Sequence, residues 1–218
     1  MSSLPLFSPA AIEVDAGTVR RYFASVGPES DVLIRNFHHE EPVSPSLYRS
    51  ARAASVLIPL TDAPKPQLLM TRRQHSISAP GQICFPGGTR EPSDPNPTAT
   101  ALRETREEIG IAAEAVEPLG TLGRYYSHSG HEITPVVAVL HPPYELRPDP
   151  SEVDEVVYLD ASDAFRPDAY RLVQHDPDHP RAHYHVSAGP KPITGPTVCV
   201  LMHLYQCLAD FLEREQPS

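Results

Sequence analysis

Residues 84–111, CFPGGTREPSDPNPTATALRETREEIGI, carry the pattern from which the fold can be inferred. The stretch predicts a helix over residues 97–109. Asn96 suits the N-cap, and Pro97 suits the first helical position, where a missing N–H costs nothing. Gly110 suits the left-handed residue that ends a helix. We therefore expect one helix with both ends defined.

Three glutamates share one side of this helix, which follows a predicted tight diglycine turn at residues 87–88. Glu104, Glu107 and Glu108 stand at i, i+3 and i+4, so they lie within about 100° of one another. Like charges at this spacing repel, but a hard cation that prefers oxygen ligands would hold them together. Arg103, one turn before Glu107, is placed to pair with it. The pattern predicts a metal-assisted hydrolase; the alternative is a solvated charged face. The opposite side, which we expect to pack on the domain, carries Thr98, Ala101, Leu102, Thr105 and Ile109.

FPGG followed by RETREEIGI resembles the Nudix box, G-x5-E-x7-R-E-U-x-E-E-x-G-U, in which U is a bulky apolar residue. Two positions depart from it. Thr105 stands at the first apolar position, and the stretch between Gly88 and Arg103 is one residue longer. The longer spacing resembles the coenzyme A diphosphatase branch, in which two acids follow FPGG. Glu91 and Asp94 occupy those two positions.

A second motif, upstream, is similar to the same branch. Residues 68–88, LLMTRRQHSISAPGQICFPGG, resemble L-L-T-x-R-(S/A)-x3-R-x3-G-x3-F-P-G-G. Met70 replaces the Thr of that motif, Arg73 its small residue and Ile77 its second Arg. Because an Arg is the natural partner of a phosphate oxygen, Arg73 is a candidate for a displaced substitute.

The resemblance implies hydrolysis of a diphosphate linkage with Mg²⁺ or Mn²⁺ as cofactor. Glu104, Glu107 and Glu108 would be the metal ligands, and the backbone carbonyl near Gly88 would add another. Arg103 would act in catalysis by orienting a glutamate. Glu107 is our first choice for the general base and Glu104 the second. The implied substrate-binding residues are Arg72, Arg73, Gly87, Gly88 and His128.

Two further groups of residues leave alternatives open. His128 lies in a predicted loop, residues 125–131. It could act as a base or contact a phosphate, or it could be an exposed loop histidine without a role in the site. The acids of SEVDEVVYL, residues 151–159, precede a predicted strand; Nudix relatives often carry a Glu-rich segment there, and a solvated turn explains it nearly as well. The four histidines of residues 175–185 favour a surface hairpin over a metal site, because two prolines interrupt them.

Composition fits a soluble, cytoplasmic enzyme of one compact domain. The formal charge of −10 argues against a nucleic acid polymer as partner, because such binding relies on basic surface. The sequence predicts no signal peptide and no membrane span. The three cysteines are too few for a disulfide framework, and Cys84 is predicted to be a small core residue. Oligomeric state stays open, with a homodimer as one alternative.

The order of predicted elements indicates an α+β fold, namely a Nudix-type α/β/α sandwich with a mixed central β-sheet and a catalytic loop-helix. We expect an N-terminal arm with a short helix over residues 1–50 and a hydrolase domain over residues 51–218. Residues 36–50 are predicted to form a loop. Helices are predicted at 17–26, 97–109, 161–166 and 196–214, and strands at 53–60, 67–73, 84–85, 117–126, 133–140, 153–159, 169–174 and 182–187.

The expected function is metal-dependent hydrolysis of coenzyme A or its acyl derivatives, which gives 3′,5′-ADP and 4′-phosphopantetheine. One alternative is the same chemistry on ADP-ribose, NADH or a nucleoside triphosphate. The other is a catalytically silent domain that binds a ligand or a protein, against which the three intact glutamates argue.

Overall fold

The computed structural model describes residues 7, 9–38, 44–76, 78–174, 182–187 and 192–215. Ile77 and the histidines at 175 and 179 lie outside the described residues. The helices are α1 (Ala16–Val26), α2 (Pro45–Ser50), α3 (Pro97–Ile109), α4 (Ala161–Ala164) and α5 (Pro196–Glu215). The strands are β1 (Arg52–Thr61), β2 (Gln67–Arg73), β3 (Ile83–Cys84), β4 (Gly87–Thr89), β5 (Val116–Thr121), β6 (Tyr125–Tyr126), β7 (His131–Leu140), β8 (Val153–Asp160), β9 (Tyr170–Gln174) and β10 (Ala182–Val186). Short 3₁₀ turns span Ala113–Ala115 and Pro167–Ala169.

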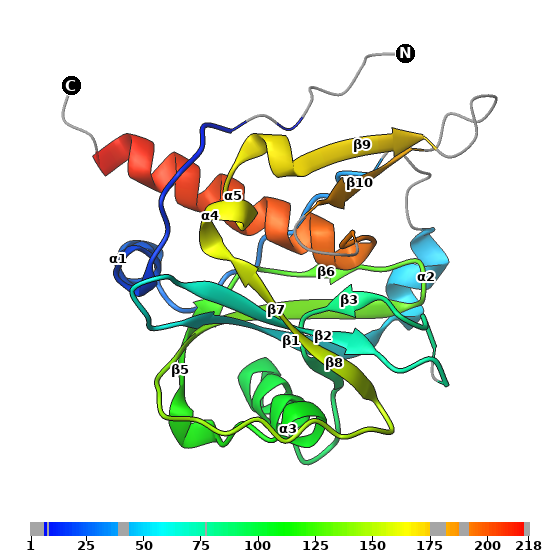
Figure 1. Cartoon of the computed structure of the whole chain (residues 1–218). Coiled ribbons are helices and arrows are strands. Elements are labelled where there is room, and N and C mark those ends of the chain that lie inside the picture. The colour runs from blue at the N-terminus through cyan, green and yellow to red at the C-terminus, as the bar shows by residue number, and fades with distance from the viewer. Residues whose placement is uncertain are drawn as a thin grey trace.

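A mixed sheet forms the middle layer of the molecule (Figure 1). Strand β1 pairs in parallel with β7 along ten residues and antiparallel with β2, while β5 and β6 pair antiparallel with β7. Strand β2 pairs antiparallel with β8 on one edge and with β3. Strands β9 and β10 form a separate two-stranded hairpin. The predicted α+β fold with a mixed sheet between helices is confirmed.

Successive residues of the central strands point to opposite faces of the sheet and are buried in two different apolar layers, as the two-residue period of a strand requires. Leu57 and Leu69 pack with the apolar residues of α3, such as Ile109. Ile58 and Leu68 point to the opposite face, into the larger cluster that includes α5. Figure 1 shows α3 on one side of the sheet and α5 with the β9–β10 hairpin on the other.

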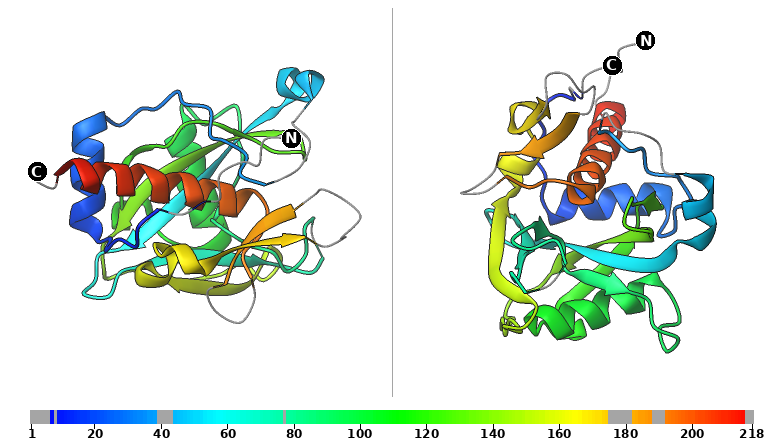
Figure 2. Two further views of the ribbon diagram at one scale, coloured as in Figure 1. Left: turned by 90° about the horizontal axis from the view of Figure 1, so that it is seen from above. Right: turned by 90° about the vertical axis from the view of Figure 1, so that its right-hand side faces the viewer.

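Helix α1 crosses near the C-terminal end of α5 (Figure 2). The rings of Tyr22 and Phe211 lie 5.8 Å apart, edge to face. Arg21 reaches Glu215 at 3.4 Å. The helix predicted at 17–26 and the one at 196–214 are therefore present and pack on the same face of the sheet.

Three predicted features are wrong. The single strand predicted at 117–126 is two strands, β5 and β6, separated by residues 122–124. The segment predicted as a diglycine turn is strand β4, which pairs antiparallel with β1 through Ser55↔Gly88 and Val56↔Gly87. Part of the loop predicted at 36–50 is helix α2, capped by the Ser44 side chain, which accepts from the amide of Leu47. The prediction missed the strand because glycine pairs favour turns in isolation. Pairing with β1 decides their conformation here.

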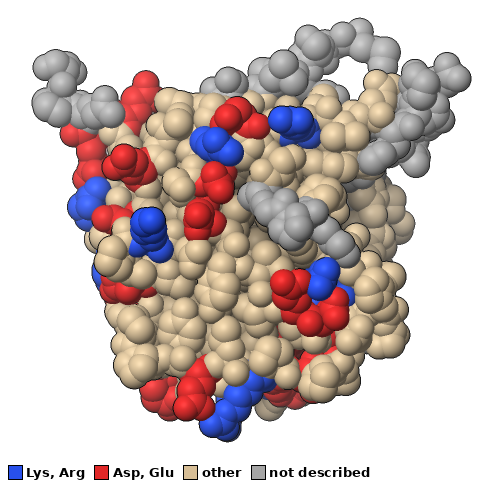
Figure 3. Space-filling model, viewed as in Figure 1, with Lys and Arg blue, Asp and Glu red and all other residues tan. Residues whose placement is uncertain are grey.

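The surface of the molecule carries both signs of charge. On the face in Figure 3, the described Lys and Arg side chains lie among Asp and Glu side chains. None of the helices in the described part of the chain has both the length and the apolar character needed to cross a membrane.

Candidate active site

Helix α3 begins and ends where the sequence predicts. The Asn96 side chain accepts a hydrogen bond from the amide of Ala99 at 2.9 Å. Gly110 ends the helix with a φ of 75°, and its amide donates to the carbonyl of Arg106. Thr105, at the apolar position of the box, is buried, and its hydroxyl donates to the carbonyl of Ala101 at 2.7 Å. This bond satisfies the polar atom, so the threonine fits a core position.

The two glycines of β4 allow the strand to lie against its neighbours without space for a side chain. A Cβ on Gly87, whose φ is 154°, would collide with the carbonyl oxygen of Ser55 and would lie 2.6 Å from the Cα of Val56. A Cβ on Gly88 would lie 2.6 Å from the carboxylate of Glu104. Strand β4 therefore lies directly beside the acidic flank of α3.

Glu104 and Glu108 both point to this strand. The Glu108 carboxylate accepts from the amide of Gly87 at 3.3 Å, and the residue is 4% exposed. Burial raises the pKa of Glu108 to about 8, and the nearby Glu152 and Glu104 charges add to the increase. Burial also raises the pKa of Glu104, although Arg103 opposes the shift. Two carboxylates thus share a poorly hydrated strip between helix and strand.

Glu107 leaves the helix in a different direction. Its side chain is 57% exposed, and its carboxylate lies 2.8 Å from Nη1 of Arg103. The same nitrogen lies 3.0 Å from Glu104. The predicted pairing of Arg103 with Glu107 is present. The guanidinium therefore links two of the three glutamates.

Residues of the segment before the helix hold the Arg103 side chain in place. Its Nε and Nη2 donate to the two carboxylate oxygens of Asp94 at 3.1 and 2.9 Å. Nη2 also donates to the carbonyl of Thr89 at 3.0 Å. The paired guanidinium holds the pKa of the Asp94 carboxyl well below its usual range. Sequence reasoning noted Asp94 as a box acid but missed its contact with Arg103; the acid at a fixed spacing after FPGG was the available signal.

The expectation that all three glutamates face away from the packed side is wrong for Glu108. Its side chain lies in the interior because β4 covers that flank of the helix. As the side chains lie, no three His, Cys, Asp or Glu among the described residues form a group that could hold a metal ion. The donor chemistry nevertheless fits a hard divalent cation, because Glu104 and Glu108 offer oxygens with mutually unfavourable charge. Glu107 would be the third carboxylate of the set.

The two arginines of β2 occupy different surroundings. Arg72 lies 3.0 Å from Asp154 and 2.6 Å from Glu155, both on β8. Nε of Arg73 donates to the carbonyl of Ser78 at 2.9 Å. The Arg73 charge also lowers the pKa of Glu108, which places it on the side of the glutamates. The structure brings Arg73 to the acidic strip and directs Arg72 to an ion-paired cluster.

Two distal segments carry the remaining candidate residues. His128 is exposed in the turn between β6 and β7, where its role as a substrate contact stays a prediction. Glu152 lies before β8, where its carbonyl accepts from the amide of Gln74 at 2.8 Å. The amide of Asp149 donates to the carbonyl of Glu108, so this segment is fixed to the end of α3. The sequence placed Glu152 in an acidic segment, but only the fold brings its charge to Glu104 and Glu108.

Residues 51–180 match the model of the NUDIX domain family. A protein of Photorhabdus laumondii named "Uncharacterized Nudix hydrolase NudL" is 38% identical over 143 residues, which cover 65% of this chain and 76% of that protein. The protein of the same name from Yersinia enterocolitica is 34% identical and covers 69% and 77%. The crystal structure of a MutT/nudix family protein from Enterococcus faecalis is similar with a TM-score of 0.49 and 16% identity, and covers 78% of this chain and 65% of that one.

Proposed function

Because this chain belongs to the NUDIX family, and is therefore a hydrolase of small molecules that contain a diphosphate, we propose that its substrate is coenzyme A or an acyl derivative of it. The products are 3′,5′-ADP and the corresponding 4′-phosphopantetheine. The observation that carries the proposal is the position of Arg73. It belongs to the motif of residues 68–88, and its charge lowers the pKa of Glu108, so the second motif acts on the box electrostatically.

The three positions at which residues 68–88 depart from that motif differ in what they mean for the proposed substrate. Met70 is completely buried, so the residue at this position packs in the core and does not reach a substrate. Arg73 takes the place of a small residue, and its guanidinium offers donors in the geometry that phosphate oxygens accept. Ile77, which replaces an Arg, lies outside the described residues.

The glutamates and Arg103 have separate roles in the proposed mechanism. Glu104, Glu107 and Glu108 would hold the divalent cation, and the carbonyl near Gly88 would be a further ligand. Bound there, Mg²⁺ or Mn²⁺ would neutralise charge at the diphosphate and would lower the pKa of a water. Glu107 accepts the proton of the attacking water, and Glu104 is the second candidate. Arg103 fixes the direction of Glu107 through the 2.8 Å contact.

The Asp94–Arg103 pair supports this mechanism because it leaves Arg103 little freedom. The guanidinium has a bidentate contact with Asp94 and a bond to a backbone carbonyl. A side chain held in this way orients its neighbours at low entropic cost. We therefore assign Arg103 to positioning and not to substrate contact. We also place the hydrolase domain at residues 51–218, preceded by an arm over residues 1–50.

The direct test is an assay of the purified full chain with Mg²⁺ and, separately, Mn²⁺. The substrates are coenzyme A, acetyl-coenzyme A, ADP-ribose, NADH and ATP at equal concentration, and products are identified by mass spectrometry. We expect the highest kcat/KM on the two coenzyme A substrates, with 3′,5′-ADP among the products. A kcat/KM on coenzyme A well below that on ADP-ribose or ATP would exclude the assignment. The Glu107→Gln variant is the control for contaminating hydrolases.

A further inference from the structure

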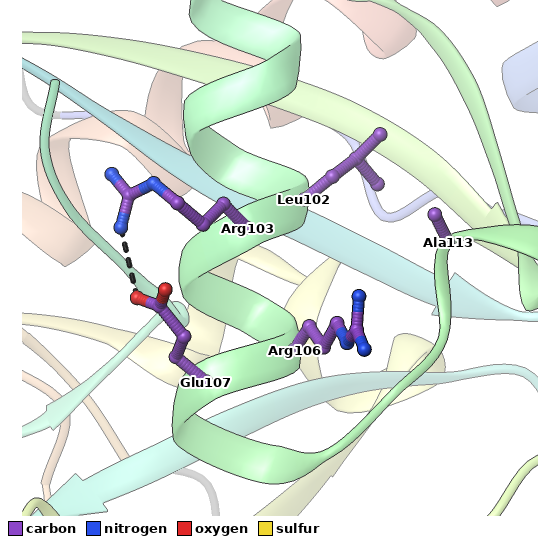
Figure 4. A pocket seen from close by; sticks show the side chains of 5 residues that line it. All are labelled: Leu102, Arg103, Arg106, Glu107 and Ala113. Carbon is purple, nitrogen blue, oxygen red and sulfur yellow. Dashed lines mark hydrogen bonds and ion pairs between the residues drawn. The ribbon is translucent and has the colours of Figure 1, made fainter. Parts of the chain in front are cut away.

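A hollow of about 420 Å³ lies along the outer side of α3 (Figure 4). Two walls are apolar, from Leu102 and from Ala113 after the helix. The Arg103–Glu107 pair lines one side, and Arg106 lines the side toward Ala113. Because Glu107 forms part of its wall, the hollow reaches one of the three glutamates of the proposed site.

Arg103 and Arg106 differ in whether nearby carboxylates compensate their positive charges. Arg103 has three carboxylate partners, namely Asp94, Glu104 and Glu107, and its positive charge is therefore compensated. The Arg106 guanidinium has no hydrogen bond or ion pair within the described part of the chain, and the residue is exposed. In a chain of formal charge −10, an uncompensated guanidinium in the hollow that Glu107 borders is a local site for an anion.

We propose that Arg106 binds the phosphate that a nucleotide substrate carries outside its diphosphate, which in coenzyme A is the 3′-phosphate of the ribose. This inference rests on the proposed substrate and adds the residue that distinguishes it from nucleotides without the third phosphate. The apolar walls at Leu102 and Ala113 lie beside the guanidinium and suit the adjacent nucleoside. The fork of an arginine donates two parallel hydrogen bonds to one phosphate, which a lysine cannot reproduce.

A structural role for Arg106 makes a different prediction. The residue lies in the last turn of α3, where a positive charge interacts favourably with the helix dipole. That interaction contributes to stability and is insensitive to the ligand. Binding selectivity between two nucleotides separates the two roles, because helix stability affects both nucleotides equally.

The experiment is calorimetric titration of the full chain with 3′,5′-ADP and with 5′-AMP, at low salt and a fixed Mg²⁺ concentration. Neither ligand has a diphosphate linkage, so turnover does not interfere. We expect 3′,5′-ADP to bind about tenfold more tightly than 5′-AMP, as a charged hydrogen-bonded pair provides. Arg106→Ala should reduce the ratio to about one, and Arg106→Lys should keep part of it. Arg171→Ala, an equal change of charge at an exposed position on β9, should leave the ratio unchanged.

Equal affinities for the two nucleotides in the native chain, or a ratio that Arg106→Ala does not change, would overturn the inference. Failure of the proposed function has a different signature. If coenzyme A is not hydrolysed but the selectivity depends on Arg106, the phosphate site stands and the substrate assignment falls. If coenzyme A is hydrolysed but 3′,5′-ADP and 5′-AMP bind equally well, the substrate assignment stands and the phosphate site falls. Thermal unfolding of each variant confirms that the fold is retained.

Discussion

A methyl group on Gly88 would lie 2.6 Å from the carboxylate of Glu104, so strand β4 and helix α3 meet without room for one additional carbon. The contact is between backbone on β4 and the end of a side chain on α3. Since backbone in a paired strand moves less readily than a side chain, the strand sets the position of the carboxylate. The glycine thus serves the geometry of the site more than the conformation of the chain.

We predict that Gly88→Ala lowers kcat by about 10–100-fold and changes the free energy of unfolding by less than about 1 kcal/mol. The added methyl forces the Glu104 carboxylate away, and the flexible side chain absorbs the displacement. Steady-state kinetics and thermal unfolding measure the two effects. Unchanged kcat would show that the position of Glu104 is not critical.

Gly87→Ala provides the contrasting variant. Here the added Cβ collides with the Ser55 carbonyl and lies 2.6 Å from the Val56 Cα, and φ is 154°. Backbone cannot move aside as a side chain does, so we expect a loss of more than about 2 kcal/mol of stability. Chemical denaturation measures it. A stability equal to that of Gly88→Ala would contradict the steric assignment of the two glycines.

We predict that Asp94→Asn lowers activity by about 10–100-fold, in the range for residues that orient a metal ligand. The amide keeps the shape but loses the charge that Arg103 contacts at 2.9 Å. Because Arg103 lowers the pKa of Asp94, the stability that the pair contributes is complete above the usual Asp value of 3.8 and is lost as pH falls from there through the lowered pKa of the folded state. Asp168→Asn, an exposed aspartate, is the control. Equal activities of the two variants would remove Asp94 from the proposed mechanism.

The parts of the fold that follow local rules could be predicted from the sequence. The α3 helix was predicted with its boundaries because Asn96 and Gly110 define its ends. Strands β1 and β2 were predicted because their apolar residues are continuous between turn residues. Strand β4 could not be predicted, since its conformation depends on contact with Ser55 and Val56, more than thirty residues earlier in the chain.

The site was predictable as far as helical periodicity determines it. Periodicity gives the angles between Glu104, Glu107 and Glu108, but not which flank a neighbouring strand covers. Glu108 is buried because β4 lies over it, and Glu107 is exposed because none of the described segments covers its carboxylate. Similarly, the sequence makes both Arg72 and Arg73 candidates for substrate contact, and the ion pairs of Arg72 with β8 distinguish them.

That distinction predicts unequal effects of the two arginines. Arg73→Ala should raise KM for coenzyme A about tenfold with little change in kcat, because it removes binding that is uniform between ground and transition states. Arg72→Ala should leave KM within about twofold, since its guanidinium is engaged by Asp154 and Glu155. An equal increase of KM in both variants would return Arg72 to the substrate site.

Glu108 predicts a pH dependence of stability in the metal-free protein. Burial raises its pKa to about 8 in the folded state, above the ordinary 4.5. The folded chain then binds the proton more tightly than the unfolded chain, so this stability is complete below about 4.5 and is lost as pH rises through about 8. In EDTA, the Tm of the native chain should fall by several degrees between pH 6 and pH 9. Glu108→Gln should show a smaller decrease, and parallel curves would contradict the raised pKa.

Glu107→Gln separates two roles that the geometry allows for this residue. The amide retains an oxygen that Arg103 can contact, and the side chain is 57% exposed, so the fold and Tm should be unchanged. We expect kcat to fall by about 1000-fold or more, because both a charge and a proton acceptor are lost. Glu114→Gln, an exposed glutamate of the following 3₁₀ turn, is the control. If Glu107 acts only as a metal ligand, a large excess of Mn²⁺ restores turnover; if it accepts the proton of water, the metal saturates the variant and kcat stays low. Near-native kcat at ordinary metal concentration would eliminate both roles.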